Sequence, residues 1–100
     1  MRLYQVDSFD DDVQKLNPEQ QRQVEKIKEQ IIRNPHIGRP LRYNFLREKR
    51  MREKRIYFLI YEDIDVVLLL GITGKKAQTD YIDRIVELLP EYKEIIESIN

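Results

Sequence analysis

The feature that most constrains the fold is an uninterrupted apolar run, Val66 to Ile72, which follows an alternating segment after one short turn. Such a run is typical of a strand covered on both faces, and it is far too short to span a bilayer. The alternating segment, Arg55 to Tyr61, is rich in β-branched and aromatic residues, and a strand there places Ile56, Phe58 and Ile60 on one face. We therefore expect two consecutive strands, with the apolar run at the centre of a sheet.

The N-terminal third is expected to contain a strand and two helices. Residues 2–6 alternate between polar and apolar types and predict a first strand. A short helical turn follows, and Asn17-Pro18 restarts the helix because asparagine is a good N-cap and proline suits the first helical position. Asn34-Pro35 ends that helix and opens a loop that reaches Pro40. We expect the two helices to form an antiparallel hairpin.

The remaining elements complete the order β-α-α-β-β-β-α. Leu41 to about Arg50 is expected to form a strand that pairs with residues 55–61 through a hairpin near residues 51–54. A final helix carries an apolar stripe from Tyr81 onward, and Pro90 is expected to break or kink it. The sequence thus predicts a single α/β domain, residues 1–100, with a helical hairpin packed on a mainly antiparallel four-stranded sheet and a C-terminal helix.

Composition excludes several kinds of site. The chain has no cysteine and one histidine, His36, so it lacks a disulfide framework, a thiolate metal site and a multi-histidine zinc cluster. We expect neither a metal nor another cofactor.

The N-terminus turns acidic within ten residues, where a signal peptide requires an apolar stretch. A soluble cytoplasmic protein that does not enter a membrane is therefore expected.

Charge is distributed unevenly along the chain. The segment Arg39 to Arg55 holds eight of the eighteen Lys and Arg residues but two of the eighteen acids, Glu48 and Glu53. It therefore carries a net +6 over seventeen residues, and the other eighty-three residues carry −6, so the formal net charge of zero is a cancellation. A cluster of uncompensated cations suits a partner that bears phosphates. The alternative is a solvated hairpin, because runs of charge usually face water.

The element order and four local patterns resemble the RelE/ParE superfamily of small toxins from toxin–antitoxin systems. These patterns are NPHIGRPLR (residues 34–42), the strand KRIYFLIYED (residues 54–63), the following strand VVLLLGI, and its exit GKK (residues 74–76). The resemblance covers nearly the whole chain. It implies the RelE/ParE-like fold and a cognate antitoxin as partner. RelE-like members cut messenger RNA on the ribosome without a metal, whereas ParE-like members inhibit DNA gyrase.

The resemblance also assigns candidate catalytic residues. Metal-free RNA cleavage needs a base for the 2′-OH proton, positive charge for the pentavalent transition state and an acid for the departing 5′-oxygen. Arg55 matches the arginine of the family's strand motif, Arg50 matches a basic position on the preceding strand, and Lys76 matches the basic position after the fourth strand. Glu48 is the candidate base, with an ion pair to Arg52 or Arg50 as its structural alternative.

Further residues are candidates for RNA binding. Lys75 is the neighbour of Lys76, Tyr81 lies one position from the family's base-stacking tyrosine, and Tyr57 shares the strand face of Arg55. Four more cations of the basic segment are expected to hold flanking backbone: Arg42, Arg47, Lys49 and Arg52. Each has a structural alternative, either as a solvated charge or, for the tyrosines, as part of the core. We expect Arg50, Arg55 and Lys76 to converge on one phosphate, with Lys54 pointing to the opposite face.

The first of three functions is the one we predict, and the other two remain as alternatives. The first is a ribosome-dependent messenger RNA endoribonuclease that leaves 2′,3′-cyclic phosphate ends and so inhibits translation. The second is a ParE-like gyrase inhibitor, and the third is a non-catalytic RNA- or ribosome-binding domain. The chain departs from the RelE pattern because Leu46 and Glu48 stand where two lysines are expected, and His36 lies away from the basic segment.

Overall fold

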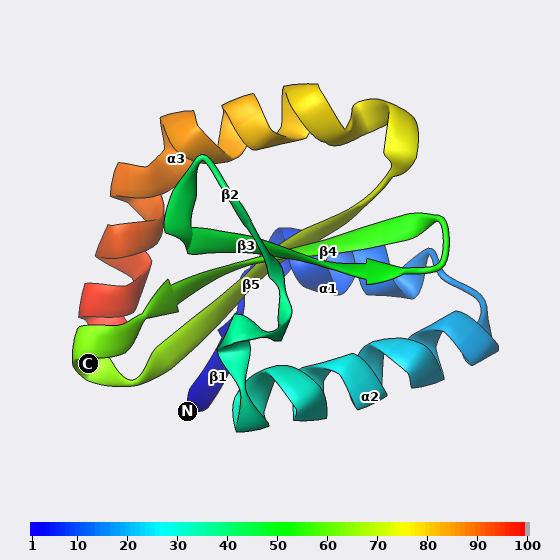
Figure 1. The fold of residues 1–100 in the computed structure, drawn as a ribbon, viewed down its shortest axis with the longest axis horizontal. Helices are drawn as coiled ribbons and strands as arrows, with labels where there is room; N and C mark the ends of the chain where they lie inside the picture. Colours follow the sequence, from blue (N-terminus) through cyan, green and yellow to red (C-terminus); the bar gives the residue numbers. More distant parts are fainter. Residues whose placement is uncertain (100) are drawn as a thin grey trace.

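The computed structural model describes residues 1–99 and shows one five-stranded sheet between two helical layers (Figure 1). The spatial order of the strands is β1-β5-β4-β3-β2. Their bounds are β1 (Arg2–Gln5), β2 (Arg39–Leu41), β3 (Tyr43–Met51), β4 (Lys54–Tyr61) and β5 (Val66–Gly74). β1 runs parallel to β5, and all other neighbours are antiparallel. The predicted α/β class and the mainly antiparallel sheet are confirmed.

Helices cover both faces of the sheet. α1 (Asp7–Gln14) and α2 (Pro18–Arg33) run antiparallel and pack on one face, while α3 (Gln78–Ile99) packs on the other (Figure 1). The predicted helical hairpin is therefore confirmed. Asn17 starts α2 with a complete capping box, in which its side chain accepts a hydrogen bond from the Gln20 backbone and Gln20 reaches back to the Asn17 N–H.

The alternation of β4 divides the core into two hydrophobic clusters. Ile56, Phe58 and Ile60 contribute to the cluster under α1 and α2, whereas Tyr57 and Leu59 contribute to the cluster under α3. β5 behaves in the same way and is buried from residue 66 to residue 71. Both faces of the apolar run are covered, as its composition predicts. β5 is an interior strand between β1 and β4.

The predicted count of four strands is wrong, because residues assigned to a loop form the edge strand β2. Arg42 adopts a left-handed backbone conformation with a φ of 46°, which reverses the chain so that β2 lies antiparallel to β3. Pro40 is tolerated in this strand because an edge strand needs hydrogen bonds on one side alone. The strand expected to start at Leu41 accordingly begins at Tyr43.

Pro90 bends α3 without ending it. The helix continues from Gln78 to Ile99, and Figure 1 shows its red C-terminal half turned away from its yellow half. Tyr92 and Ile96, beyond the proline, are buried against the sheet with Ile85. The predicted kink is confirmed, and the apolar tail folds back onto the core. Within residues 1–99, no helix combines the length and apolarity that crossing a membrane requires.

Candidate functional site

The β3–β4 hairpin brings the main candidate residues together. Arg50 and Arg55 are direct cross-strand partners, and the strands are joined by a two-residue turn in which Arg52 has a φ of 54°. On the other side of β4, Arg55 pairs with Thr73 and Lys54 pairs with Gly74. The chain then leaves β5 into a 3₁₀ turn, residues 75–77, that carries both exit lysines. These two registers place the exit lysines beside the arginine pair.

These residues line a cleft of about 690 Å³. We call it the basic cleft and define it by its lining: Arg50, Arg52, Glu53, Lys54, Arg55, Gly74, Lys75, Lys76 and Ala77. Six cations and one acid therefore face one cavity. Arg50, Arg55 and Lys76, the three residues expected to converge on one phosphate, all line this cleft. Lys54 was expected to point the other way, but at the end of the strand, opposite Gly74, it lines the same cleft.

A smaller cleft of about 300 Å³ adjoins the basic cleft and shares Arg50 and Arg55 with it. Lys49 and Glu48 also line this second cavity, together with Ile37 and Arg39. Lys49 is half-buried, whereas Arg50 is exposed. Arg55 forms the buried floor that the two cavities share, since this residue is only 6% exposed.

A buried carboxylate holds the floor arginine. Glu48 is 7% exposed; its Oε2 lies 3.9 Å from the Arg55 Nε and accepts a 2.6 Å hydrogen bond from Gln78 Nε2. Its Oε1 pairs with Arg39 at 2.7 Å. Arg55 also donates a hydrogen bond from Nη1 to the Glu53 carbonyl at 3.4 Å. The ion pairs of Glu48 are thus with Arg39 and Arg55, instead of the expected Arg52 or Arg50. Arg39 of β2 is the direct cross-strand partner of Glu48 in β3.

The two candidate stacking tyrosines pack on each other. Tyr57 is 0% exposed, and its ring lies 4.9 Å from the half-buried Tyr81 ring at an angle of 43°. The Tyr57 hydroxyl is 2.9 Å from Thr73 Oγ1. Burial raises the pKa of both phenols, and the nearby Tyr92 and Asp12 raise the pKa of Tyr81 further. Tyr57 therefore presents no open face to a base, and Tyr81 uses part of its ring against Tyr57.

Two cations of the basic segment point elsewhere. Arg47 is buried, and its guanidinium donates hydrogen bonds to the Asn44 carbonyl at 3.0 Å, the Asn44 side chain at 2.7 Å and the Gly38 carbonyl at 2.7 Å. These hydrogen bonds hold the segment between α2 and β3 in place, and the buried guanidinium is not accessible to RNA. Arg42 pairs with Asp83 of α3 and does not line either cleft. Arg52 lines the basic cleft and pairs with Glu19 at 3.6 Å.

Sequence reasoning missed three residues of this region. Arg39 and Gln78 hold Glu48, and Thr73 holds Tyr57. Gln78 carried no signal in the sequence, because a contact between residues 48 and 78 depends on the three-dimensional pairing of β3, β4 and β5. His36 stays in the loop, as expected, and pairs with Glu62 at 2.9 Å when protonated. Among residues 1–99, no group of three or more His, Asp or Glu side chains is placed to hold a metal ion.

Comparison with known proteins identifies the fold. No protein-family model and no curated protein matches the chain. Among solved structures, a free double mutant of the E. coli toxin RelE superposes with a TM-score of 0.72 and 13% identity, over 87% of this chain and 96% of that one. The toxin–antitoxin complex RelBE2 from Mycobacterium tuberculosis gives a TM-score of 0.66 and 20% identity, over 74% of this chain and 96% of its match.

An archaeal structure agrees with these two. The RelB–RelE antitoxin–toxin complex from Methanococcus jannaschii gives a TM-score of 0.62 and 14% identity, over 78% of this chain and 96% of its match. The matched chains are covered almost completely, and the likeness extends over 74–87% of this chain. The sequence identities are low, and the TM-scores of 0.62 to 0.72 establish the fold alone. This chain has the fold of the RelE toxins, as its sequence motifs predicted.

Proposed function

We propose that this chain is the toxin of a type II toxin–antitoxin system and that it cleaves messenger RNA on the ribosome without a metal. The observation that carries the proposal is the basic cleft, in which Arg50, Arg55 and Lys76 face one cavity with three further cations. Like charges placed directly opposite on neighbouring strands are destabilising. The Arg50–Arg55 pair is therefore an arrangement that an anionic ligand stabilises.

The free charge of the cleft supports a phosphate ligand. Within residues 1–99, Arg50, Lys75 and Lys76 form no ion pair, and all three are exposed. Arginine grips a phosphate with a planar, bidentate fork and stays charged at any relevant pH. Arg55, held from below by Glu48, presents its guanidinium from a fixed position, whereas Arg50 approaches from the opposite strand. We infer that the two arginines bind the non-bridging oxygens of the scissile phosphate.

The proposed reaction is an internal transesterification. The 2′-oxygen attacks the adjacent phosphorus, the bond to the 5′-oxygen breaks, and the products are a 2′,3′-cyclic phosphate and a 5′-hydroxyl. The proton lost by the 2′-OH must be accepted, and one must be supplied to the departing 5′-oxygen. In our proposal Lys76 supplies that proton, while the arginines and Lys75 stabilise the negative charge of the pentavalent transition state.

Glu48 takes a different role in this proposal. Both of its oxygens already have partners, because Oε1 pairs with Arg39 and Oε2 accepts a hydrogen bond from Gln78. We therefore infer that Glu48 positions Arg55 instead of accepting the 2′-OH proton. Glu53 is the one carboxylate among the described residues that line the basic cleft. It is exposed at the hairpin turn, and we infer that it is the group that acts as base.

Because the oxygens of Glu48 are already occupied, a second candidate function is also favoured. If no carboxylate acts as base, the same cleft serves as a non-catalytic RNA- or ribosome-binding surface. The cations alone are sufficient for that role, because phosphate contacts supply most of non-specific affinity. For either function we propose a cognate antitoxin, since the solved toxin of M. jannaschii is bound to its antitoxin. An acidic segment of this partner would complement the basic cleft.

Primer-extension mapping of transcripts after expression tests the proposal. We expect discrete cuts with the wild-type chain and a loss of about 10²–10³-fold for the double variant Arg50→Ala, Lys76→Ala. Both side chains are exposed, so this variant should fold. The variant Lys15→Ala, Arg33→Ala removes the same two types of charge from the helical hairpin and should cut as the wild type does.

Other results would reject the nuclease. Intact transcripts combined with inhibition of gyrase supercoiling would favour the ParE-like alternative. Intact transcripts combined with ribosome binding that weakens as salt rises would favour the binding domain. Equal loss of cutting in the two double variants would show that total charge matters and that the basic cleft does not.

A further inference from the structure

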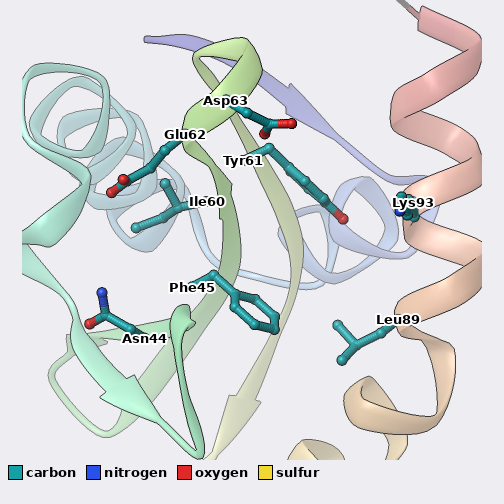
Figure 2. A pocket seen from close by; sticks show the side chains of 8 residues that line it. All are labelled: Asn44, Phe45, Ile60, Tyr61, Glu62, Asp63, Leu89 and Lys93. Atoms are coloured by element: carbon teal, nitrogen blue, oxygen red, sulfur yellow. The ribbon is translucent and has the colours of Figure 1, made fainter.

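A second cavity lies at the other end of the β3–β4 hairpin and differs from the basic cleft in character. It has a volume of about 550 Å³ and lies between β3, the end of β4 and the middle of α3 (Figure 2). We call it the apolar pocket. Phe45, Ile60, Tyr61 and Leu89 form its walls, and Figure 2 shows the Phe45 ring directed toward Leu89. Its volume is within the range of about 300–1,000 Å³ that is typical of binding sites.

The apolar pocket exists because two strands separate. The register of β3 with β4 ends at the pair Leu46–Leu59, although β4 continues to Tyr61 against β5. Beyond that pair, Phe45 leaves β4, and α3 spans the resulting gap. Phe45 is 41% exposed and stacks on Tyr43, which is 44% exposed, with their ring centroids 4.9 Å apart. The pocket therefore opens onto an aromatic surface that extends past its own walls.

Charge at the rim indicates the kind of ligand. Glu62 and Asp63 lie at one side of the pocket and Lys93 at the other. Glu62 pairs with His36, but Asp63 and Lys93 form no ion pair within residues 1–99. The unpaired rim charges are thus one acid, Asp63, and one cation, Lys93. A polypeptide can supply a basic residue for Asp63 and an acidic one for Lys93, whereas a phosphate backbone supplies anions alone and is repelled by Asp63. The apolar pocket thus complements an apolar side chain that has a basic neighbour.

We propose that the apolar pocket binds a bulky apolar side chain of the neutralising protein partner, with an adjacent Lys or Arg of that partner paired to Asp63. The proposal rests on the proposed toxin function, because the partner is the antitoxin of that system. Aromatic and aliphatic anchors that fill a pocket, surrounded by a polar rim, supply most of the affinity of protein interfaces. The exposed Tyr43 ring extends the contact beyond what a small molecule would need.

The position of the apolar pocket gives the partner two sites of opposite character. Arg55 and Tyr61 lie at opposite ends of β4, six residues apart, which corresponds to about 20 Å along a strand. A partner that occupies both places needs acidic residues at the basic cleft and apolar and basic residues at the apolar pocket. Such a charge pattern fixes the direction in which the partner lies along the hairpin.

The proposal is tested by calorimetric titration of the full chain with the antitoxin, which the proposed toxin function predicts to be the product of an adjacent small open reading frame. We expect Phe45→Ser and Asp63→Lys each to raise the Kd at least about tenfold. Ile32→Ser is the matched control for Phe45→Ser, because Ile32 is 40% exposed on α2. Glu29→Lys is the matched control for Asp63→Lys, since Glu29 is an exposed acid on the same helix. Both controls should change the Kd less than about twofold.

A charge-reversal experiment provides an independent readout. Replacing the basic residue of the partner by Glu should weaken binding to the wild-type chain and restore binding to Asp63→Lys. Wild-type affinity of both pocket variants, or equal weakening of binding by the two controls, would overturn the proposal. It would also be overturned if bound RNA protected the residues of the apolar pocket in a footprinting experiment. Affinity is measured without any cleavage assay. If the chain proves not to cut RNA, the measured affinities can therefore still be interpreted. If Phe45→Ser weakens partner binding but cuts RNA as the wild type does, the apolar pocket and the basic cleft act separately.

Discussion

At the turn end of the β3–β4 hairpin the two strands stay in register through Met51 and Lys54, whereas at the other end they separate after Leu46 and Leu59. The paired end concentrates cations, because the register sets Arg50 directly opposite Arg55. The separated end exposes apolar side chains, since Phe45 no longer packs on β4. One hairpin thus presents two surfaces of different chemistry, and the difference originates in backbone pairing as much as in residue type.

The two ends also differ in how their charges are supported. The basic cleft has a buried support, in which Glu48 joins Arg39, Arg55 and Gln78. The carboxylates at the apolar pocket are exposed and have one partner, His36. The charge of Arg55, which buried partners hold in one position, suits precise contact with a reacting phosphate. Exposed rim charges suit recognition of a partner by complementarity.

Among changes that distinguish the two ends of the hairpin, Glu48→Ala is expected to have the largest effect on the free energy of unfolding. The change leaves the nearly buried Arg55 without its carboxylate, and breaking a buried ion pair costs about 3 kcal/mol of unfolding free energy. Glu53→Ala, at the exposed turn, should change stability by less than about 0.5 kcal/mol. Urea unfolding followed by circular dichroism measures both. Equal stability of the two variants would mean that Glu48 does not support the cleft.

A somewhat smaller effect is expected at Gly71, where β5 passes under Tyr81. A Cβ there would overlap the Tyr81 hydroxyl and lie 3.0 Å from the Asp12 carboxylate, so Gly71→Ala should destabilise the fold by about 1–3 kcal/mol. Tyr81→Phe removes the obstructing hydroxyl. The double variant should therefore be more stable than the sum of the single changes predicts, as a thermal double-mutant cycle would reveal. Additive losses would show that the Tyr57–Tyr81 pair is loosely packed.

The sequence predicts the elements of this fold well because their signals are local. The alternation of residues 55–61, the apolar run of β5 and the Asn17-Pro18 cap each lie within one element. The meeting of Arg50 with Arg55 was also predictable, because a two-residue turn joins their strands. Local patterning and short connections carry enough information for such features.

The fate of the other cations was not predictable in this way. Arg42 and Arg47 belong to the same basic segment as Arg50, yet one pairs with α3 and the other is buried against a loop. The cause is the left-handed conformation of Arg42, which folds β2 back along β3 and shifts the register between Pro40 and Leu41. Simple alternation fails at such an irregularity. A count of charges therefore overstates the site, because only part of the segment faces the cleft.

The smallest expected effect is on the pH dependence of stability and comes from Tyr61, which lines the apolar pocket. Burial, with a contribution from Tyr92, raises the pKa of Tyr61 to about 12, compared with about 10 for an unfolded chain. The neutral phenol is thus favoured in the fold. Its contribution to stability is complete below pH 10 and is lost as pH rises toward 12, because the unfolded state releases its proton first.

Tyr61→Phe should therefore reduce the loss of stability between pH 10 and pH 12, by about 1 kcal/mol, since partial exposure screens the effect. Tyr43→Phe, which removes a hydroxyl from the exposed ring beside the pocket, serves as the matched control. Unfolding at several pH values, with phenolate absorbance as a second signal, measures the difference. Binding of the partner should protect Tyr61 from ionisation further, because an apolar side chain in the pocket removes its remaining water. An unchanged titration of Tyr61 in the complex would place the partner outside the apolar pocket.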